Sequence, residues 1–342
     1  DNIPPTVLTK DITVYLDASG AASIVPADID NGSTDNCGID SYSLDIDAFD
    51  CSNVNNPVTV TLTVTDIHSN SASNTAVVTV LDKVKPELTT QNITRELDAD
   101  GNTITIGPED VVTHSWDACG IQDTTLSKYD FDCGNVGYNT ISVILTDVNG
   151  NQTVKTAVVT IEDNIPPEAL CKDDTVYLGA NGIGTTSEQE IDNGSNDACG
   201  ISQMLLSKSV FDCQDISTNP NNVFLNVYDN SMNRSVCTAD ITVIDTVKPV
   251  ALCTDITIEL DASGNASITP SQIDNGSSDA CGIESRVLDI SGFTCNEVGD
   301  NPVVLTVKDV NGNQASCNAT VKVEDNTAPV VATQNITVQL DN

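Results

Sequence analysis

An internal repeat of about 80 residues is the feature that most constrains how this chain can fold. Each copy opens with an aspartate four residues before a proline, and the prolines are separated by 81, 81, 82 and 80 residues (Pro5, Pro86, Pro167, Pro249 and Pro329). A fixed period indicates tandem copies of one structural unit rather than the two or three unrelated domains that 342 residues alone would suggest. The expected domains are 1–81, 82–162, 163–244 and 245–324, called repeats one to four below, and the first strand of a fifth repeat at 325–342. Since the chain lacks an initiator Met and stops within a repeat, we expect it to belong to a longer array.

The repeat has the pattern of short β-strands. Residues 58–65 alternate apolar side chains with Thr, which is typical of a half-buried strand. Similar Val-, Ile- and Thr-rich segments at 12–16, 22–25, 39–46 and 75–81 are separated by Asp-Ala-Ser-Gly, Asp-Asn-Gly and Asn-Gly turns, and no segment shows a sustained helical period. The pattern predicts an all-β chain of Ig-like or fibronectin-like β-sandwich repeats, arranged head to tail as an elongated rod. A phenylalanine two residues before a cysteine in each repeat is expected in the core (Phe49, Phe131, Phe211 and Phe293).

The charge of the chain excludes several partners. Fifty acidic and thirteen basic residues give a net charge of −37. Nucleic acid is excluded because its binding needs Lys and Arg to neutralise phosphates, and an anionic membrane surface is disfavoured for the same reason. No apolar run approaches the ~18 residues of a membrane span, so no membrane insertion is expected. The carboxylates do suit divalent cations, which bind oxygen ligands.

Twelve cysteines follow the repeat. Each repeat has two that are fourteen residues apart, and because repeats one and two contain no others, we expect them to bond within the repeat as Cys37–Cys51, Cys119–Cys133, Cys199–Cys213 and Cys281–Cys295. Such bonds need Cα atoms within ~7 Å, so residues 38–50 must double back, near 45–48. Repeats three and four also contain cysteines that are absent together from repeats one and two, which predicts the bonds Cys171–Cys237 and Cys253–Cys317.

Disulfides on this scale indicate an oxidising, extracellular setting. Zinc is disfavoured because the chain has no Cys-x-x-Cys and its two histidines, His68 and His114, lie outside the repeated pattern. The stretch Asp-Asn-Gly-Ser-Thr-Asp-Asn-Cys-Gly-Ile at 30–39 is interpreted as a turn pinned by a disulfide, with Asp30 and Asp35 as secondary ligand candidates. Repeat two has Val112 in place of Asp30 but keeps Asp117.

The order of motifs resembles a known family. Asp-x-x-x-Pro, a cysteine, Phe-x-Cys, Asp-x-x-Gly-Asn and a closing Val-rich strand resemble HYR repeats, which are Ig-like modules of extracellular proteins. The acidic, Asn- and Thr-rich composition is similar to the tandem repeats of giant Bacteroidota surface adhesins of the SprB type, which serve gliding motility. The resemblance covers all four repeats, although repeats one and two lack the second disulfide of the fuller pattern. It implies an adhesive or stalk role at the cell surface.

The turn before the last strand of each repeat is the strongest site candidate. It reads Asp-x-x-x-Asn in every repeat, while the Asn-Gly of a type I′ hairpin turn is lost in repeats one and three, which favours oxygen ligands over turn chemistry alone. In a head-to-tail array this turn should face the linker aspartate, and bacterial Ig-like adhesin repeats resemble that arrangement. Such a junction suits Ca²⁺, which takes six to eight oxygens. The predicted ligands are Asp1, Asp66 and Asn70; Asp82, Asp147, Asn149 and Asn151; Asp163, Asp229 and Asn233; and Asp245, Asp309, Asn311 and Asn313.

Three functions are compatible with these features. The first is a non-enzymatic segment of a surface adhesin, a calcium-stiffened stalk that holds an adhesive region away from the cell; its partners would be further repeats of the same chain and surface polysaccharide or a host or substratum. The second is a module that recognises a carbohydrate or protein, through a loop at 114–117 that contains the only tryptophan, Trp116, which we expect to be a packing residue. The third is an accessory part of a secreted hydrolase. No repeated nucleophile or acid–base pair indicates catalysis.

Overall fold

The computed structural model describes residues 2–339, and the chain divides between Ile165 and Pro166 into two compact units. Repeats one and two lie in the first unit, and repeats three and four in the second. Asp1 lies outside the described residues. Among residues 2–339, no helix has the length and apolar character needed to cross a membrane.

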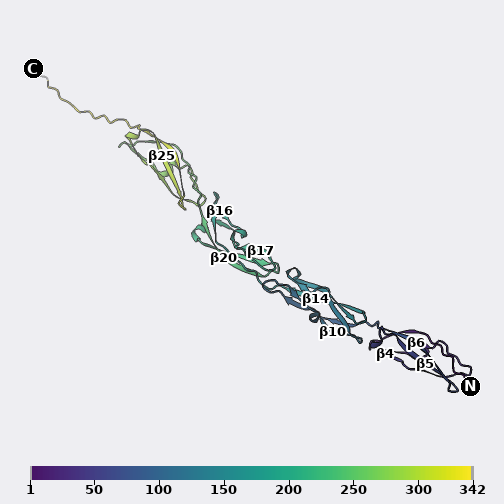
Figure 1. The fold of residues 1–342 in the computed structure, drawn as a ribbon. Coiled ribbons are helices and arrows are strands. Elements are labelled where there is room, and N and C mark those ends of the chain that lie inside the picture. The colour runs from purple at the N-terminus through teal and green to yellow at the C-terminus, as the bar shows by residue number, and fades with distance from the viewer. Residues whose placement is uncertain (1, 340–342) are drawn as a thin grey trace. The chain divides into compact units, whose positions relative to one another are not determined.

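Repeat one is a sandwich of two unequal sheets. The larger sheet has the strand order β1-β6-β5-β3, in which only the β1–β6 pair is parallel. The smaller sheet is the antiparallel pair β2-β4. Figure 1 shows β5 and β6 as the long central pair, with β4 beside them. The elements are β1 (Ile12–Tyr15), β2 (Ala21–Ser23), α1 (Pro26–Ile29), β3 (Ile39–Leu44), β4 (Ala48–Asp50), the 3-10 turn η1 (Cys51–Asn53), β5 (Val58–Asp66) and β6 (Ser71–Leu81).

Repeat two has the same order and one additional pair. Its larger sheet reads β8-β14-β13-β11, its small sheet is β9-β12, and β7 pairs with β10. The elements are β7 (Glu87–Thr90), β8 (Ile93–Glu96), β9 (Ile104–Thr105), α2 (Pro108–Val111), β10 (Val112–Trp116), β11 (Ile121–Leu126), β12 (Asp130–Phe131), η2 (Cys133–Asn135), β13 (Gly137–Asp147) and β14 (Gln152–Glu162). The place of the β7–β10 pair is taken in the other repeats by isolated bridges such as Thr6 with Thr34.

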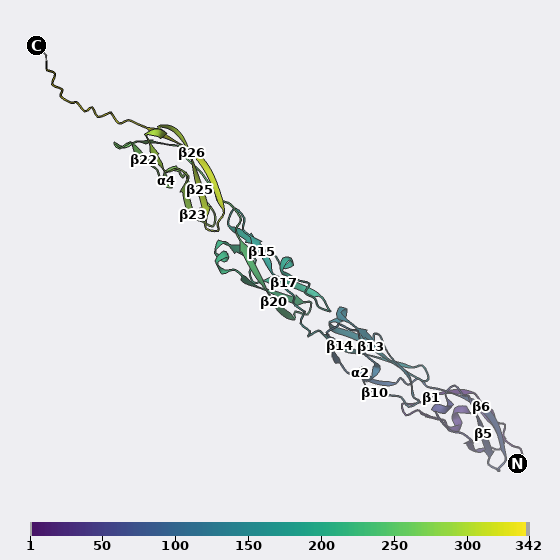
Figure 2. The ribbon, with the colours of Figure 1, turned by 60° about the vertical axis from the view of Figure 1, so that its left-hand side comes forward.

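Repeats three and four return to the order of repeat one, with larger sheets β15-β20-β19-β17 and β21-β26-β25-β23 and small sheets β16-β18 and β22-β24. Figure 2 shows β22 and α4 beside the long β25–β26 pair. In repeat three the elements are β15 (Asp174–Tyr177), β16 (Ile183–Thr185), α3 (Glu188–Ile191), β17 (Ile201–Leu206), β18 (Val210–Asp212), η3 (Cys213–Thr218), β19 (Asn221–Asp229) and β20 (Arg234–Ile244). In repeat four they are β21 (Ile256–Glu259), β22 (Asn265–Ser267), α4 (Pro270–Ile273), β23 (Ile283–Leu288), β24 (Gly292–Thr294), η4 (Cys295–Glu297), β25 (Gly299–Asp309) and β26 (Gln314–Glu324).

The core of each repeat follows from the alternating strand pattern. In β5 the apolar residues Val60, Leu62 and Val64 are fully buried, while the threonines between them are only partly covered. Phe49 on β4 packs against this face, and its equivalents in the other repeats are equally buried, as the sequence predicts. One-turn helices each bury a single β-branched residue, such as Ile29 of α1. The predicted all-β fold of tandem sandwiches is confirmed.

The predicted disulfides between cysteines fourteen residues apart are wrong. Cys51 bonds Cys119 of the next repeat and Cys213 bonds Cys281, so none of the four predicted pairs forms. The reason is the path of the chain, which does not double back at 45–48. It leaves the larger sheet after β3, crosses to the small sheet as β4 and continues to the other end of the sandwich. The backbone next to Cys37 therefore contacts the turn after β5, where Ile67 N donates to Gly38 O at 3.2 Å, whereas Cys51 lies beside Gly20 in the turn between β1 and β2.

Ten cysteines are disulfide-bonded, Cys133 and Cys199 among them, and two are free and exposed within residues 2–339, Cys37 and Cys295. The structure contains the bonds expected within repeats three and four, Cys171–Cys237 and Cys253–Cys317. Each of these joins the start of a repeat to its last strand. The disulfides thus form two classes, one that closes a sandwich and one that links neighbouring sandwiches.

Candidate metal centre

The turn before the last strand is built around a buried aspartate. Asp147, at the end of β13, has no exposed surface. Its Oδ1 accepts hydrogen bonds from the backbone N–H of Asn149 and Asn151 at 2.8 and 2.9 Å, and its Oδ2 accepts one from Asn151 Nδ2 at 2.8 Å. Asp66 with Asn70 and Asp229 with Asn233 make the same three bonds.

These bonds give the retained Asp and Asn a structural cause. The carboxylate side chain closes the turn by accepting from backbone donors two and four residues later, which is the known behaviour of Asp in turns. The asparagine amide then saturates the second carboxylate oxygen. Retention of Asp-x-x-x-Asn without Asn-Gly, which the sequence suggested to be a ligand signal, therefore also has a structural explanation in repeats one and three.

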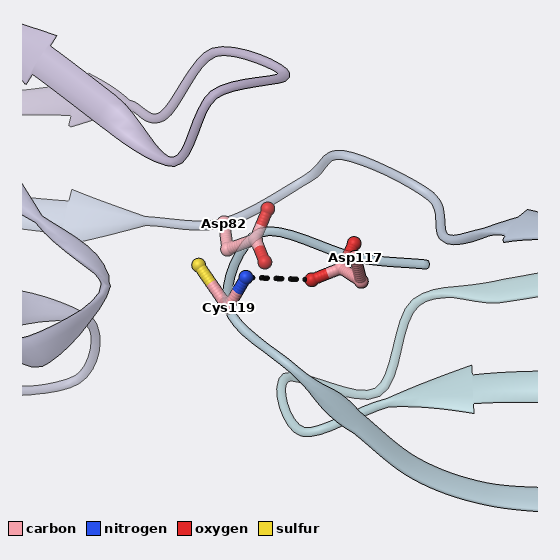
Figure 3. Close-up of side chains that lie close together, drawn as sticks. All are labelled: Asp82, Asp117 and Cys119. Atoms are coloured by element: carbon pink, nitrogen blue, oxygen red, sulfur yellow. Dashed lines mark hydrogen bonds between the residues drawn. The ribbon is translucent and has the colours of Figure 1, made fainter. Parts of the chain in front are cut away.

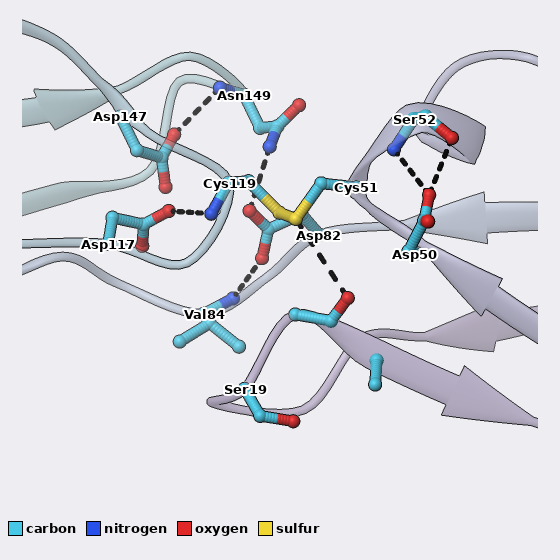
Figure 4. The surroundings of a disulfide bond; sticks show 12 residues. Ser19, Asp50, Cys51, Ser52, Asp82, Val84, Asp117, Cys119, Asp147 and Asn149 are labelled. Carbon is cyan, nitrogen blue, oxygen red and sulfur yellow. Dashed lines mark hydrogen bonds between the residues drawn. A yellow bond between two sulfur atoms is a disulfide. The ribbon is translucent and has the colours of Figure 1, made fainter.

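Where two repeats meet inside a unit, the turn lies beside the linker. Asn149 Nδ2 donates to Asp82 Oδ2 at 2.8 Å, and Asn151 Nδ2 lies 3.4 Å from the backbone oxygen of Asp82. Asp117 approaches from the loop before β11, and the ligand atoms of Asp82, Asp117 and Cys119 lie within 4.8 Å of one another (Figure 3). Figure 4 shows that the Cys51–Cys119 disulfide borders this acidic group. Its bonded sulfur is no thiolate, which leaves the ligand set to oxygens.

The carboxylates at this junction repel one another. Burial raises the pKa of Asp117 above its ordinary value, and the negative charges of Asp147 and Asp82 raise it further, against the opposing hydrogen bond from Cys119 N. The ion pairs formed by residues 2–339 leave Asp82, Asp117 and Asp147 without a cationic partner. The junction thus concentrates negative charge in a half-buried place, which a cation would neutralise.

The junction before repeat four has the equivalent acidic residues, and some of their oxygens lack a hydrogen-bond donor. Asp245 is buried in the linker, and Asp279 stands where repeat two has Asp117. Burial raises the pKa of Asp245, and the charges of Asp279 and Asp309 add to the rise. Three buried oxygens there have no hydrogen-bond donor: Asp245 Oδ2, Asp309 Oδ2 and Asn311 Oδ1. Buried acceptors without donors are rare in native proteins, and a bound ion is one of the few explanations.

The structure thus gathers part of the predicted ligand set. Asp82 lies with Asn149 and Asn151, and Asn313 Nδ2 donates to the backbone oxygen of Asp245 at 3.2 Å. Sequence reasoning missed Asp117 and Asp279 as primary members. The signal was available, since every repeat has an aspartate two residues before the first of its two cysteines that are fourteen residues apart. Asp163, whose carboxylate accepts from Ile165 N at 3.2 Å, stays a predicted ligand.

The stretch at 30–39 is a pair of turns, and no disulfide pins it. Asp30 accepts from the N–H and hydroxyl of Ser33, and Asp35 accepts from the N–H of Cys37 and Gly38. Burial opposes ionisation of Asp30, but the hydrogen bonds from Ser33 and Gly32 outweigh it and hold the pKa of this carboxyl below its ordinary value. Asp30 is thus occupied by its own turn.

Trp116 is not the buried packing residue that the sequence predicted. It is the last residue of β10 and pairs with Glu87 at the start of β7, and 46% of its surface is exposed. About half of its surface is therefore open to solvent. A large stability cost on its removal is therefore not expected.

No family model and no curated protein sequence matches this chain. Among solved structures, the chain is similar to several proteins with tandem domains. Sidekick-1 immunoglobulin domains 1-5 match with a TM-score of 0.35 and 8% identity over 93% of this chain and 79% of that one. Drosophila N-cadherin EC1-4 matches with a TM-score of 0.28 and 10% identity over 92% and 100%. An I-band fragment of titin matches with a TM-score of 0.31 and 9% identity over 70% and 99%.

Proposed function

We propose that this chain is a non-enzymatic repeat segment of a large extracellular surface adhesin of the HYR-like, Bacteroidota type, and that calcium stiffens it at the junctions between repeats. Its domains are those expected from the sequence, 1–81, 82–162, 163–244 and 245–324. It serves as a stalk that holds an adhesive region away from the cell. The observation that carries the proposal is the group of unneutralised carboxylates at each junction inside a unit, together with the three buried oxygens without donors at Asp245, Asp309 and Asn311.

The oxygens at the junction suit Ca²⁺. Asp245, Asp279 and Asp309 supply carboxylates from the linker, the loop before β23 and the turn after β25. The side chain of Asn311 supplies an amide oxygen. Asp82, Asp117, Asp147 and Asn149 are the matching set at the other junction, where the amide of Asn149 would rotate to present its oxygen. Because one cation would contact the linker and two loops of the following repeat, its binding would hold the linker on the sandwich.

The disulfides support an extracellular location. Ten bonded cysteines in 342 residues are typical of proteins in an oxidising compartment. The bonds that cross from one repeat to the next suit a segment whose neighbouring repeats must keep a fixed relation. The partners of such a segment are further repeats of the same chain and, at its adhesive region, a surface polysaccharide or a host or substratum.

Calcium should raise the melting temperature of the chain. In chelator the junction carboxylates repel one another, and millimolar Ca²⁺ removes this repulsion. We expect dissociation constants of about 10⁻⁴–10⁻³ M, as in other extracellular modules. Calorimetric titration gives the affinity, and thermal unfolding with and without chelator gives the shift. If titration with Ca²⁺ gives no heat of binding and chelator leaves the melting temperature unchanged, the calcium proposal is wrong and these turns have only a structural role.

The shift in melting temperature caused by Asp279→Asn should have opposite signs in chelator and in calcium. The raised pKa of Asp245 means that its ionised form is disfavoured by folding, so without calcium this carboxyl contributes stability at low pH that is lost as pH rises through its raised pKa. Removing the neighbouring charge relieves that cost, so at neutral pH in chelator the variant should melt a few °C higher than the native chain. In calcium it should melt lower, because a ligand is lost. The Asn oxygen still accepts from Cys281 N, which keeps the loop intact.

The matched control is Asp261→Asn. Asp261 closes an exposed turn of repeat four by accepting hydrogen bonds from Ser263 N and Asn265 N. It does not belong to the acidic group at the junction. Its substitution should shift melting equally in calcium and in chelator. An Asp279→Asn variant that behaves like this control would contradict a shared cation at the junction.

Recognition of a carbohydrate is the second candidate, and the half-exposed indole of Trp116 favours it. An exposed aromatic face can stack on a sugar ring. We expect Trp116→Ala to change the free energy of unfolding by less than about 1 kcal/mol, since little packing is lost. Tyr138, which is also exposed on repeat two, provides the control Tyr138→Ala. Glycan-array binding that depends on Trp116 and not on Tyr138 would establish recognition; binding lost in neither or in both would exclude this site.

A further inference from the structure

The two free cysteines have the same surroundings as cysteines that are bonded between repeats. Cys295 occupies in repeat four the position of Cys51 and Cys213, directly after the small sheet and at the start of a 3-10 turn. Cys37 occupies the position of Cys119 and Cys281, two residues before β3, β11 and β23 respectively, the strands that pair with the first long strand of each repeat. Cys51 bonds Cys119 and Cys213 bonds Cys281, so each bond joins one cysteine of each kind. One cysteine of each kind is left free.

We propose that Cys295 and Cys37 are open halves of further inter-repeat disulfides. Cys295 bonds the cysteine of the following repeat that is equivalent to Cys119 and Cys281. Cys37 bonds the cysteine that follows the small sheet of the preceding repeat. In repeats two and four the receiving cysteine lies 37 and 36 residues after the junction aspartate (119 − 82 and 281 − 245). Counted from Asp325, the partner of Cys295 therefore lies beyond the 342 residues of this chain.

The half-site at Cys295 is built as it is at the bonded positions. Cys51 Sγ lies 3.9 Å from Gly20 O and Cys213 Sγ lies 3.8 Å from Gly182 O. Cys295 Sγ lies 3.7 Å from the equivalent Gly264 O, although no disulfide holds it there. The sulfur is thus positioned by its own repeat.

The glycine beside this sulfur leaves room for the next repeat. A Cβ on Gly20 would lie 2.9 Å from Cys51 Sγ and 3.0 Å from the Cβ of Ala118, the residue before the receiving cysteine. A Cβ on Gly182 would meet Cys213 Sγ and Ala280 in the same way. At Gly264 the contact with Cys295 Sγ remains and the place of the alanine is open. The surface is therefore shaped for an incoming residue as small as alanine.

The half-site at Cys37 is also preformed. Asp35 accepts from Cys37 N at 2.8 Å, as Asp117 does from Cys119 N at 2.9 Å and Asp279 from Cys281 N at 2.8 Å. The glycine that follows has positive φ in all three places, +116° at Gly38, +107° at Gly120 and +108° at Gly282. The loop that presents the sulfur thus has one conformation whether or not its cysteine is bonded.

Bond formation balances by thiol–disulfide exchange. A protein dithiol–disulfide oxidant of the extracytoplasmic compartment supplies the disulfide. The Cys295 thiolate attacks one oxidant sulfur and forms a mixed disulfide, and the thiolate of the following repeat then displaces that sulfur. The oxidant leaves as a dithiol with the two electrons and two protons of the protein thiols. Ca²⁺ takes no part, so failure of this inference is distinguishable from failure of the calcium proposal.

The test is to supply the missing neighbour. Residues 325–342 are replaced by a second copy of residues 82–162, so that Cys295 is followed by the receiving cysteine of repeat two. In the native chain Cys37 and Cys295 should both be alkylated by a maleimide without reduction. In the extended chain only Cys37 and the copied Cys133 should react, and non-reducing peptide mapping should find Cys295 bonded to the copied Cys119.

A control with Cys119→Ser in the added copy should restore alkylation of Cys295. Cys295 that stays reactive in the extended chain, or bonds the copied Cys133 or Cys37, would overturn the proposal. Misfolding of the added copy is checked by mapping the natural protein as its cells secrete it. There Cys295 and Cys37 should be bonded to cysteines of flanking repeats in the same polypeptide, whereas free thiols or bonds to another chain would also overturn it.

Discussion

Replacing Cys51 and Cys119 together with serine should cost the first unit about 4 kcal/mol of stability, because the bond closes a loop with a sequence separation of 68. That loop contains the last strands of repeat one, the linker and the first half of repeat two. Removing the bond therefore increases the conformational entropy of unfolded segments from both repeats. The double substitution is chosen because a single one would leave a reactive thiol at the junction.

Trypsin offers a direct measurement of this effect. Lys83 is exposed in the linker, whereas the bond after Lys85 is protected by Pro86. We expect rapid cleavage after Lys83 in the serine variant and slow cleavage in the native chain. When the native chain is cleaved, its two pieces should separate on a gel only after reduction, since the disulfide spans the cleaved bond.

The control is the pair Cys171→Ser and Cys237→Ser, which opens a bond inside repeat three. It should lower the melting temperature of that repeat and leave cleavage after Lys83 unchanged. Equal cleavage rates in the native chain and in the Cys51/Cys119 variant would show that the bond does not restrain the linker.

Asp147→Ala should be the other large effect, at roughly 3 kcal/mol or more, because three N–H donors lose a fully buried acceptor. The turn would open, and β13 and β14 would lose their closing bonds. Thermal or denaturant unfolding measures the change. Most of this cost should remain in chelator, because the three turn bonds do not depend on calcium, and any additional cost in calcium measures the loss of a ligand.

Repeat two contains a matched control in Asp98→Ala. Asp98 accepts the same three kinds of bond, from Asp100 N, Asn102 N and Asn102 Nδ2, but its turn is exposed. Water can replace the lost acceptor there, so we expect a cost below about 1 kcal/mol. Similar costs at Asp98 and Asp147 would contradict the importance of burial.

The sequence predicted the sandwich well because side-chain alternation is a local signal. The Thr-separated apolar residues of 58–65 define β5, and the phenylalanine before each second cysteine occupies the core. Disulfide pairing is not local. Because the repeats have a fixed period, the positions of the cysteines in the sequence are compatible both with bonds within a repeat and with bonds to the next repeat. The strand from Ile39 to Leu44 decides between them, since six extended residues carry the chain about 20 Å away from Cys37.

The acidic site was only partly predictable for a related reason. Asp147 and Asn151 recur because they close a turn, so their recurrence carries no separate signal for a ligand. Asp117 and Asp279 recur before a cysteine and were first assigned to a turn. Their second property, proximity to a linker aspartate about 35 residues earlier in the sequence, follows from how one repeat meets the next.

The Cys51–Cys119 bond also determines which part of the chain would carry tension. The covalent path of a pull along the polypeptide passes from Cys51 to Cys119 through the sulfurs, so the backbone of β5, β6 and the linker lies outside that path. Without the bond, unfolding of those strands would lengthen the chain by about 230 Å, the extended length of the 68 residue steps that the bond bypasses. Stretched from its ends, this unit can therefore lengthen only by the residues outside the bypassed loop until the disulfide itself is reduced.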